Sequence, residues 1–429
     1  MQTTPAEIPA EPGYMTILQL IVSGLGLALS LLGAALLALV GLVAVMSENP
    51  EMPEIGPVFT LAWVCGLAAL LAIPSVYFSI RRMMRSPVAV LPLRRFNGFR
   101  TAAVMILLWP LVLALGSMLS TSSLAWLFLP PLQILAIGLP IWFLVELVRR
   151  GLPTGSRQRG WGIFNASMFL MTPAAVVIEL VLFVALAVAF AVWVSGQPAL
   201  LEELEQLGIL LSNGPNNPEA ILEAVQPYLQ NPLVIVTILG LLGGVTPLLE
   251  ELIKPVALWV LAGRRLTPAE GFVGGALCGA AFALIESLMS LGSATGPEWA
   301  GLAVGRAGTG LLHIGTTALV GWGLASAWTE GKYLRLGLAF LGASAYHGLW
   351  NALSLLPAFA AVLDPAPQDL AVIVSIARFG PAMLVILSVC MLLLLVLFNR
   401  RLREQFLIVD PDNLTIPERV SPPADEPPV

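Results

Sequence analysis

The feature that most constrains this chain is a series of ten apolar stretches, each long enough to cross a lipid bilayer. A transmembrane α-helix needs about 20 mostly apolar residues. The stretches cover residues 15–46, 55–80, 101–120, 124–148, 167–194, 233–262, 269–291, 299–328, 336–363 and 380–398. Only 11% of all residues are charged, against about 25% in soluble domains. The sequence therefore predicts an all-α fold, a polytopic transmembrane helical bundle of about ten spans.

Lysine and arginine indicate the orientation of these spans. All but three of the 21 basic residues follow the second, fourth, sixth, eighth or tenth span: Arg81, Arg82, Arg85, Arg94, Arg95, Arg100, Arg149, Arg150, Arg157, Arg159, Arg264, Arg265, Lys332, Arg335, Arg400, Arg401, Arg403 and Arg419. The alternate loops contain none. Because cytoplasmic loops carry the excess of Lys and Arg, we expect both termini in the cytoplasm.

Composition divides the chain into five regions. Residues 1–196 form a five-span membrane region of unknown role, 197–232 an acidic extracytoplasmic loop, 233–363 spans six to nine, 364–407 the last span, and 408–429 a tail that we expect to be disordered. The loop is interpreted as a solvated linker on the outer membrane surface, with a lid as the alternative. The net charge of −5 and the lack of a basic cluster with aromatic residues argue against a nucleic-acid partner.

Ionisable residues inside spans six to nine are the candidate site. They and their polar neighbours are Glu250, Glu251, Lys254, Glu286, Arg306, His313, His347 and Asn351. At a rise of about 1.5 Å per residue, Glu250, His313 and His347 lie about 21 to 22 Å, and Glu286 about 27 Å, from the cytoplasmic ends of their helices. Ionisable groups in hydrocarbon are costly and mark functional sites. We therefore expect four neighbouring helices to bring these groups to one site, nearer the outer face.

Prolines, a helix-capping motif and small residues predict the local structure around this site. Pro247 and Pro255 flank the glutamate pair and are expected to bend the sixth span around a water-filled cavity. The seventh span begins with the capping signature Thr267-Pro268-Ala269-Glu270. A stripe of small residues on the same span predicts a close helix contact: Gly274, Gly275, Cys278 and Gly279. Glu179, alone in the fifth span, is interpreted as structural and as the candidate partner of Arg306.

The order of these motifs resembles a known family. Glu250-Glu251-x-x-Lys254, Phe282-x-x-x-Glu286, Arg306-Ala307 leading to His313-x-x-x-Thr317, and His347-x-x-x-Asn351 together resemble the PrsW intramembrane proteases, relatives of the CAAX prenyl proteases and bacteriocin-processing enzymes. The resemblance covers roughly residues 233–363. It departs from the wider superfamily at Glu286, where histidine is more usual. It implies a peptidase of a bacterial-type plasma membrane that cleaves single-span, membrane-anchored proteins such as anti-sigma factors.

Peptide hydrolysis needs an activated water, a clamp on the carbonyl oxygen and a proton donor for the amine. Glu250 or Glu251 is expected to activate water, with Lys254 keeping the other ionised. His347, with Asn351, is placed to stabilise the oxyanion. His313 is a candidate proton shuttle, and this favoured interpretation requires no cofactor.

Three alternatives stay open. A zinc-dependent form of the same protease would use Glu286, His313 and His347 as ligands with an open fourth position. A proton-coupled membrane transporter is the alternative from another class, because Glu, His and Lys in spans also build proton relays. It is disfavoured because the first five spans hold no counterpart to the polar cluster apart from Glu179. A catalytically silent binder of the same fold is the third.

Overall fold

The computed structural model describes residues 13–47, 55–84, 98–213, 218–259, 261, 266–292, 294, 296–362 and 371–409, and this part of the chain is helical without strands. Several sequence predictions lie outside the described residues: the loop arginines Arg85, Arg94, Arg95, Arg264 and Arg265, and the tail from residue 410 onward.

The first half of the chain supplies five spans. α1 (Tyr14–Met46) packs along α2 (Ile55–Met83), and α3 (Gly98–Met105), η1 (Ile106–Leu108) and α4 (Trp109–Leu119) form one continuous segment beside α5 (Ala125–Val148). The fifth span consists of α6 (Arg157–Ala166), a π-helical segment η2 (Ser167–Met171) and α7 (Thr172–Ser195). α5 also contacts the later helices α13 and α14, so it joins the first spans to the second half.

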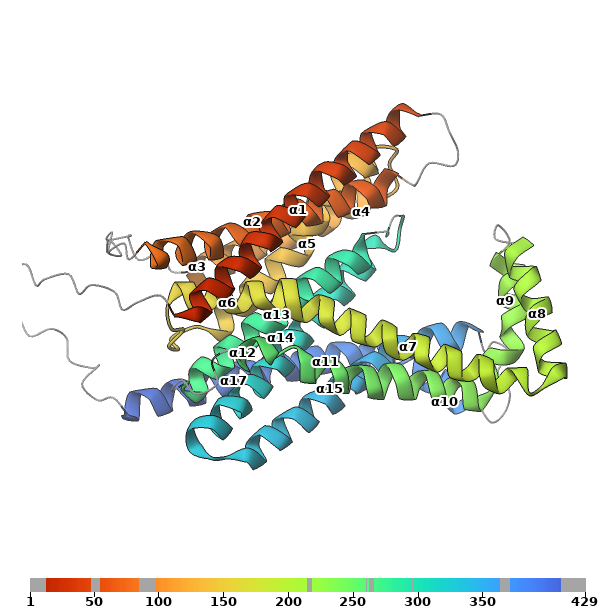
Figure 1. Ribbon diagram of the computed structural model, residues 1–429. Helices are drawn as coiled ribbons and strands as arrows, with labels where there is room; N and C mark the ends of the chain where they lie inside the picture. The colour runs from red at the N-terminus through yellow and green to blue at the C-terminus, as the bar shows by residue number, and fades with distance from the viewer. Residues whose placement is uncertain are drawn as a thin grey trace, which may run out of the picture.

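The second half begins with two short helices, α8 (Pro198–Asn213) and α9 (Pro218–Leu229), which lie beyond the ends of α7 and α10 (Figure 1). The sixth span is broken into α10 (Pro232–Gly240), a π-helical η3 (Leu241–Val245), α11 (Thr246–Ile253) and α12 (Val256–Trp259). The breaks fall next to Pro247 and Pro255, as predicted. The remaining helices are α13 (Pro268–Leu291), α14 (Trp299–Glu330), α15 (Tyr333–Val362), α16 (Ala371–Ala377) and α17 (Gly380–Val409).

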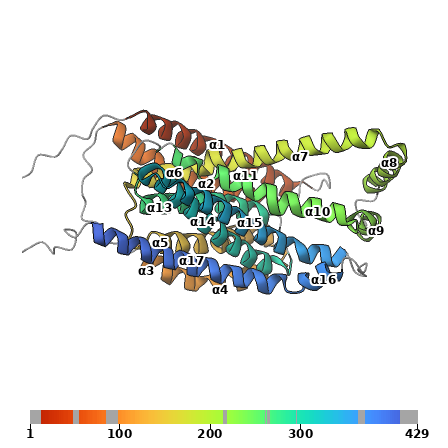
Figure 2. The same ribbon diagram turned by 90° about the horizontal axis from the view of Figure 1, so that it is seen from below.

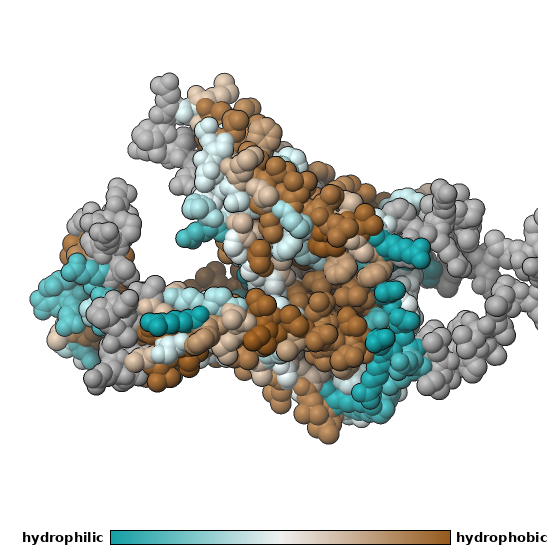
Figure 3. Space-filling model, turned by 180° about the vertical axis from the view of Figure 1, so that it is seen from behind, coloured by the Kyte–Doolittle hydropathy of each residue, from teal (hydrophilic) through white to brown (hydrophobic). Residues whose placement is uncertain are grey.

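Eight of the described segments are long and apolar enough to cross a membrane. α14 and α15, predicted as the eighth and ninth spans, are 32 and 30 residues long but are not among these eight; they carry glycine, threonine or histidine where the others carry leucine and valine. Hydrophobic side chains cover much of the surface and hydrophilic ones gather at the ends (Figure 3). The chain is therefore a multi-pass membrane protein with a helical-bundle fold.

The ends of the bundle agree with an even number of spans. The first turn of α1 and the last turn of α17 lie at one end of the molecule, and α8 and α9 lie at the other (Figures 1 and 2). The turns between α5 and α6 and between α14 and α15 lie at the first end (Figure 1). We call this first end the arginine-rich end, because the basic loops predicted to be cytoplasmic belong to it.

Glycines bring α13 and α14 into close contact at the depth of the candidate site. A Cβ atom on Gly279 would lie 2.2 Å from the carbonyl oxygen of His313, and one on Gly275 would lie 2.2 Å from that of Thr317. Only glycine permits so close an approach of two helix backbones. Gly275 and Gly279 of the predicted stripe therefore set the position of His313, whereas Gly274 faces Leu258 and Ile163. At the arginine-rich end, Thr267 and Glu270 form the predicted capping box of α13.

A candidate active site at the centre of the bundle

A buried lysine lies at the centre of the polar cluster. Lys254 follows the last residue of α11, and its side chain is completely buried. Its Nζ atom lies 2.7 Å from Glu250 Oε2, 2.9 Å from Glu251 Oε1 and 2.8 Å from His313 Nδ1. It also lies 4.4 Å from the ring centre of Phe282 on α13. The ammonium group thus connects both glutamates to α14.

Glu251 is a fully buried carboxylate whose two oxygens are both engaged. Oε1 accepts hydrogen bonds from Lys254 Nζ, from His347 Nδ1 at 3.0 Å and from Thr316 Oγ1 at 3.0 Å, and Oε2 accepts one from Thr317 Oγ1 at 3.5 Å. Such a carboxylate holds its neighbours in place. In particular it fixes the ring orientation of His347, because the bond to Nδ1 selects the tautomer.

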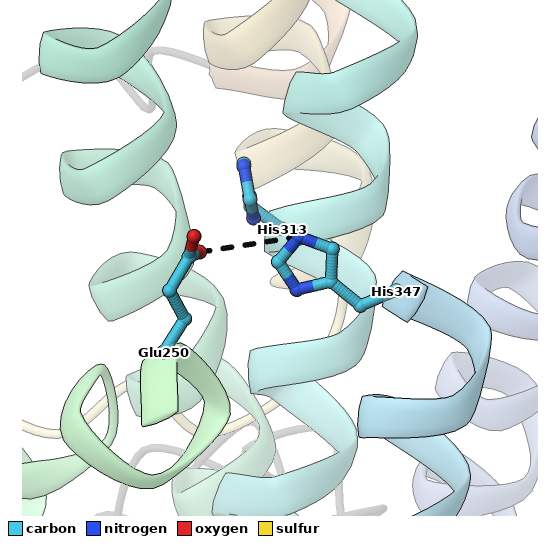
Figure 4. A group of neighbouring side chains, drawn as sticks. All are labelled: Glu250, His313 and His347. Carbon is cyan, nitrogen blue, oxygen red and sulfur yellow. Dashed lines mark ion pairs between the residues drawn. The ribbon is translucent and has the colours of Figure 1, made fainter. Parts of the chain in front are cut away.

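The two histidines face each other from α14 and α15. Their rings lie edge to face with centroids 5.0 Å apart. His313 Nε2 donates to Glu286 Oε2 at 2.7 Å, and Arg306 Nη2 lies 2.8 Å from the same oxygen. Each imidazole therefore has one nitrogen held by a carboxylate, while its other nitrogen faces Lys254 or Glu250. His347 Nε2 lies 3.9 Å from Glu250 Oε2, as the dashed line in Figure 4 marks.

The side chains of Glu250, His313 and His347 have the composition and spacing of a metal site. Each offers one ligand atom, and these atoms all lie within 4.8 Å of one another. Glu250 Oε2 is buried and lies 2.7 Å from the Lys254 ammonium. Two histidines and one carboxylate are the ligands of many catalytic zinc sites, and metal-bound histidines usually donate their other nitrogen to a carboxylate or carbonyl. The residues present therefore fit a divalent metal, with Glu250 in the place where the sequence analysis named Glu286.

One residue of the cluster was not predicted to belong to it. Glu179 on α7 interacts with Glu250, Lys254 and Glu286, and its Oε1 atom is buried without a hydrogen-bond partner. Arg306, its predicted partner, pairs with Glu286 instead. The isolated acidic residue in an apolar span was visible in the sequence. The sequence did not indicate toward which helices its side chain points.

The net charge of this cluster depends on how many of its carboxylates are ionised. Its described members include four carboxylates, on Glu179, Glu250, Glu251 and Glu286, and two permanent cations, on Lys254 and Arg306. If all four carboxylates are ionised, two positive charges are missing. A divalent metal ion would supply them.

Asn351 lies apart from this hydrogen-bonded set. It is four residues, about one helical turn, beyond His347 on α15, and its Nδ2 donates to the carbonyl oxygen of Leu242 in η3 at 2.9 Å. The side chain thus connects α15 to the π-helical segment that precedes the glutamates. The structure brings the other six predicted site residues together: Glu250, Glu251, Lys254, Glu286, His313 and His347.

The cluster is enclosed except on the side of Glu286. The Glu286 side chain is 34% exposed, whereas those of Glu250, His313 and His347 are at most 9% exposed. A separate cavity of about 400 Å³, lined mainly by apolar side chains of α12, α14 and α15, reaches Glu251. Figure 3 shows a hollow between two projecting parts of the molecule, one formed by α1, α2 and α4 and the other by α7 to α10. Glu286 is therefore the most exposed of these four side chains.

Comparison with known proteins identifies the family of the chain. The sequence model of the PrsW family intramembrane metalloproteases matches residues 161–394, more than half of the chain. The match is wider than residues 233–363, since it also contains α7 with Glu179 and the first half of α17. No curated protein and no solved structure matches the chain. The chain therefore belongs to the PrsW family of intramembrane metalloproteases and is a peptidase.

Proposed function

We propose that this peptidase hydrolyses a peptide bond in or beside the membrane span of a single-span protein, with Glu250, His313 and His347 holding a zinc ion. The observation that carries the proposal is the pair of imidazoles, each fixed by a carboxylate through one nitrogen, whose ligand atoms lie within 4.8 Å of one another and of Glu250. The description of the family as metalloproteases supports it. Zinc bound there would activate water and polarise the peptide carbonyl.

The remaining polar residues position these three side chains and move protons. Glu251 and Glu286 hold His347 and His313 in the tautomers required for metal binding. Arg306 neutralises Glu286. Glu179 Oε1 is a buried carboxylate oxygen without a hydrogen-bond donor among the described residues. With Glu250 as a ligand, Glu179 Oε1 is the acceptor for the proton of the attacking water, and it can return that proton to the leaving amine.

A metal-free form of the reaction, which the sequence alone favours, is the second candidate. One specific observation supports it: the Lys254 ammonium already contacts Glu250, Glu251 and His313, where a metal would otherwise provide the positive charge. In that form Glu250 Oε2 itself accepts the proton of the water. The two forms differ in whether activity needs a metal and in the role of Glu179.

The substrate class is proposed from the family resemblance. We propose a membrane-anchored protein such as an anti-sigma factor, cut near the outer face of a bacterial-type plasma membrane. The predicted depth of the cluster, about 21 to 22 Å from the cytoplasmic helix ends for Glu250, His313 and His347, supports a cut on that side.

The first experiment is co-expression of tagged single-span test proteins with the wild type and with Glu250→Gln, His313→Gln and His347→Ala. Each variant is expected to lower cleavage by about 10²-fold or more. Ser344→Ala is the matched control, because Ser344 is a buried residue of α15 close to His347 whose hydroxyl has no hydrogen-bond partner. Cleavage that survives all three substitutions contradicts the assignment of the site.

The second experiment measures metal. Purified protein is expected to contain about one zinc ion per chain, and a chelator is expected to remove both the zinc and the activity, with zinc restoring both. His347→Ala should lower the zinc content, whereas Ser344→Ala should not. Full activity of zinc-free protein would show that the reaction does not need a metal and would favour the metal-free form.

A further inference from the structure

A second cavity lies apart from the catalytic cluster. It encloses about 570 Å³ and is formed by α1, α6, η2 and the segment that begins with α12. These elements contact one another directly, and α1 and α6 lie side by side at the arginine-rich end in both ribbon views (Figures 1 and 2). The volume is within the range of small-molecule sites, about 300 to 1,000 Å³. None of the residues of the catalytic cluster lines it.

One end of this cavity favours an anion. Met15 and Thr16 from the first turn of α1, and Gln158 and Arg159 from the first turn of α6, line it together with Arg82 of α2. Amide groups in the first turn of a helix lack intrahelical partners and carry the positive end of the helix dipole, so they bind phosphate and carboxylate groups. Arg159 is paired with Glu270 through its side chain, and its amide donates to Ser156 Oγ. An anion in this space would therefore be held by Arg82 and by the preceding first-turn amides of α6 and α1.

The other end of the cavity is apolar. Leu18 and Val22 of α1, and Leu170 and Met171 of η2, line it. Beyond these residues, the outward faces of α1 and α7 continue with exposed hydrophobic side chains, among them Leu25, Leu29, Val177 and Val181. The cavity is therefore polar toward the membrane surface and apolar toward the bilayer interior.

We propose that this cavity binds an anionic phospholipid. The phosphate lies beside Arg82 and the first turns of α1 and α6, and the acyl chains lie along α1 and α7. A basic pocket between transmembrane helices on the side of the basic loops is the kind of site that binds anionic headgroups. The apolar wall favours an intact lipid over a soluble phosphate compound, because a soluble compound has no acyl chain to cover this wall.

The lipid would contact the segment that follows the catalytic lysine. Val256 and Ala257 line the cavity and lie two and three residues after Lys254. The site is thus separate from the active site but built on the same broken span.

Native mass spectrometry of the full chain in detergent tests the proposal. The protein is mixed with equal amounts of phosphatidylglycerol and phosphatidylcholine that have identical acyl chains. We expect the wild type to retain phosphatidylglycerol in preference to phosphatidylcholine. Arg82→Gln should weaken this retention about five-fold, the effect of one basic residue near an anionic headgroup. Arg81→Gln is the matched control: Arg81 precedes Arg82 on α2, donates a hydrogen bond to Tyr77, and does not line the cavity.

Two further measurements keep the test decisive. Ala166→Trp places an indole in the cavity from the wall of α6, and it should abolish the preference for phosphatidylglycerol even if Arg82→Gln folds poorly. Glycerol 3-phosphate at millimolar concentration should not displace the lipid. Equal retention of the two lipids by the wild type, equal effects of Arg81→Gln and Arg82→Gln, an unchanged preference in Ala166→Trp, or displacement by glycerol 3-phosphate would each overturn the proposal.

Discussion

Lys254 is a buried cation whose three neighbours are groups that also bind metals. Its side chain is fully buried between Glu250, Glu251 and His313. A buried charge is tolerated only when it is paired, and removing one partner of a buried ion pair typically costs about 3 to 5 kcal/mol. The lysine therefore stabilises the two adjacent glutamates, and zinc, if it binds, supplies charge at the same place.

The first prediction concerns this lysine. Lys254→Met should lower the free energy of unfolding of metal-stripped protein by about 3 to 5 kcal/mol, and added zinc should recover more stability in this variant than in the wild type. Thermal unfolding in detergent, with and without zinc, measures both effects. Lys332→Met is the control, because Lys332 forms an exposed ion pair with Glu330. This substitution should lower the free energy of unfolding by less than about 1 kcal/mol. Equal stability of the two variants would show that Lys254 does not stabilise the cluster.

The second prediction concerns Glu179. In the zinc-dependent reaction, Glu179→Gln should lower kcat about 10²-fold while the zinc content stays unchanged, because the amide cannot accept the proton of the water. In the metal-free reaction the same variant should retain most activity. Cleavage rates and zinc content of the purified variant decide between them. Glu202→Gln, on the exposed face of α8, is the control and should leave both quantities unchanged.

The histidines and the glutamate pair could be placed from the sequence because helical rise alone sets their depth. Glu179 could not be assigned, because α7 is apolar on every side and its rotation about its axis leaves no pattern. The partner of Asn351 depends on the irregular backbone of η3, which no spacing rule predicts. The depth of a residue in the membrane can thus be predicted from the sequence. The direction of its side chain around the helix axis can be predicted only when the helix has a polar face.

At the scale of elements, the breaks of the sixth span position the site. The α-helix is interrupted next to Pro247 and Pro255, where the sequence predicted bends, but the π-helical segment η3 that precedes Pro247 was not predicted. π-Helical segments inside longer helices often occur at functional sites. Here η3 packs against α15, the helix that carries His347, so the distance between Glu250 and His347 depends on this contact.

A glycine substitution on α15 tests that dependence. A Cβ atom on Gly348 would lie 2.0 Å from the carbonyl oxygen of Gly243 in η3. Gly348→Ala should therefore push α15 away from η3 and lower activity about 10²-fold, because small displacements of catalytic groups are costly. Gly342→Ala, on the same helix with no atom within 4 Å of its added Cβ, should keep full activity. Cleavage assays of both variants measure the difference, and normal activity of Gly348→Ala would mean that α15 can shift without harm.

At the scale of the molecule, the first four spans serve as a platform for the family core. They precede residue 161, where the family match begins. They attach through buried contacts: Gln133 of α5 donates to the carbonyl oxygen of Leu291, and Trp299 of α14 packs against Gly116 of α4. These contacts fix the outer ends of α13 and α14, the two helices that carry Glu286 and His313.

Orientation in the membrane is the last prediction, and it decides from which side the substrate is cut. In a background with Cys65, Cys278 and Cys390 replaced by alanine, Ser212→Cys on α8 should react with a membrane-impermeant maleimide in intact cells. Thr154→Cys, in the exposed turn between α5 and α6, should react only after permeabilisation, because the basic loops are expected in the cytoplasm. Reversed labelling would place the acidic loop inside the cell and the cluster nearer the cytoplasmic face. A first cut near the outer face would then be impossible and the anti-sigma-factor proposal would fall, while the peptidase class and the metal-binding geometry would stand, since neither depends on the direction of insertion.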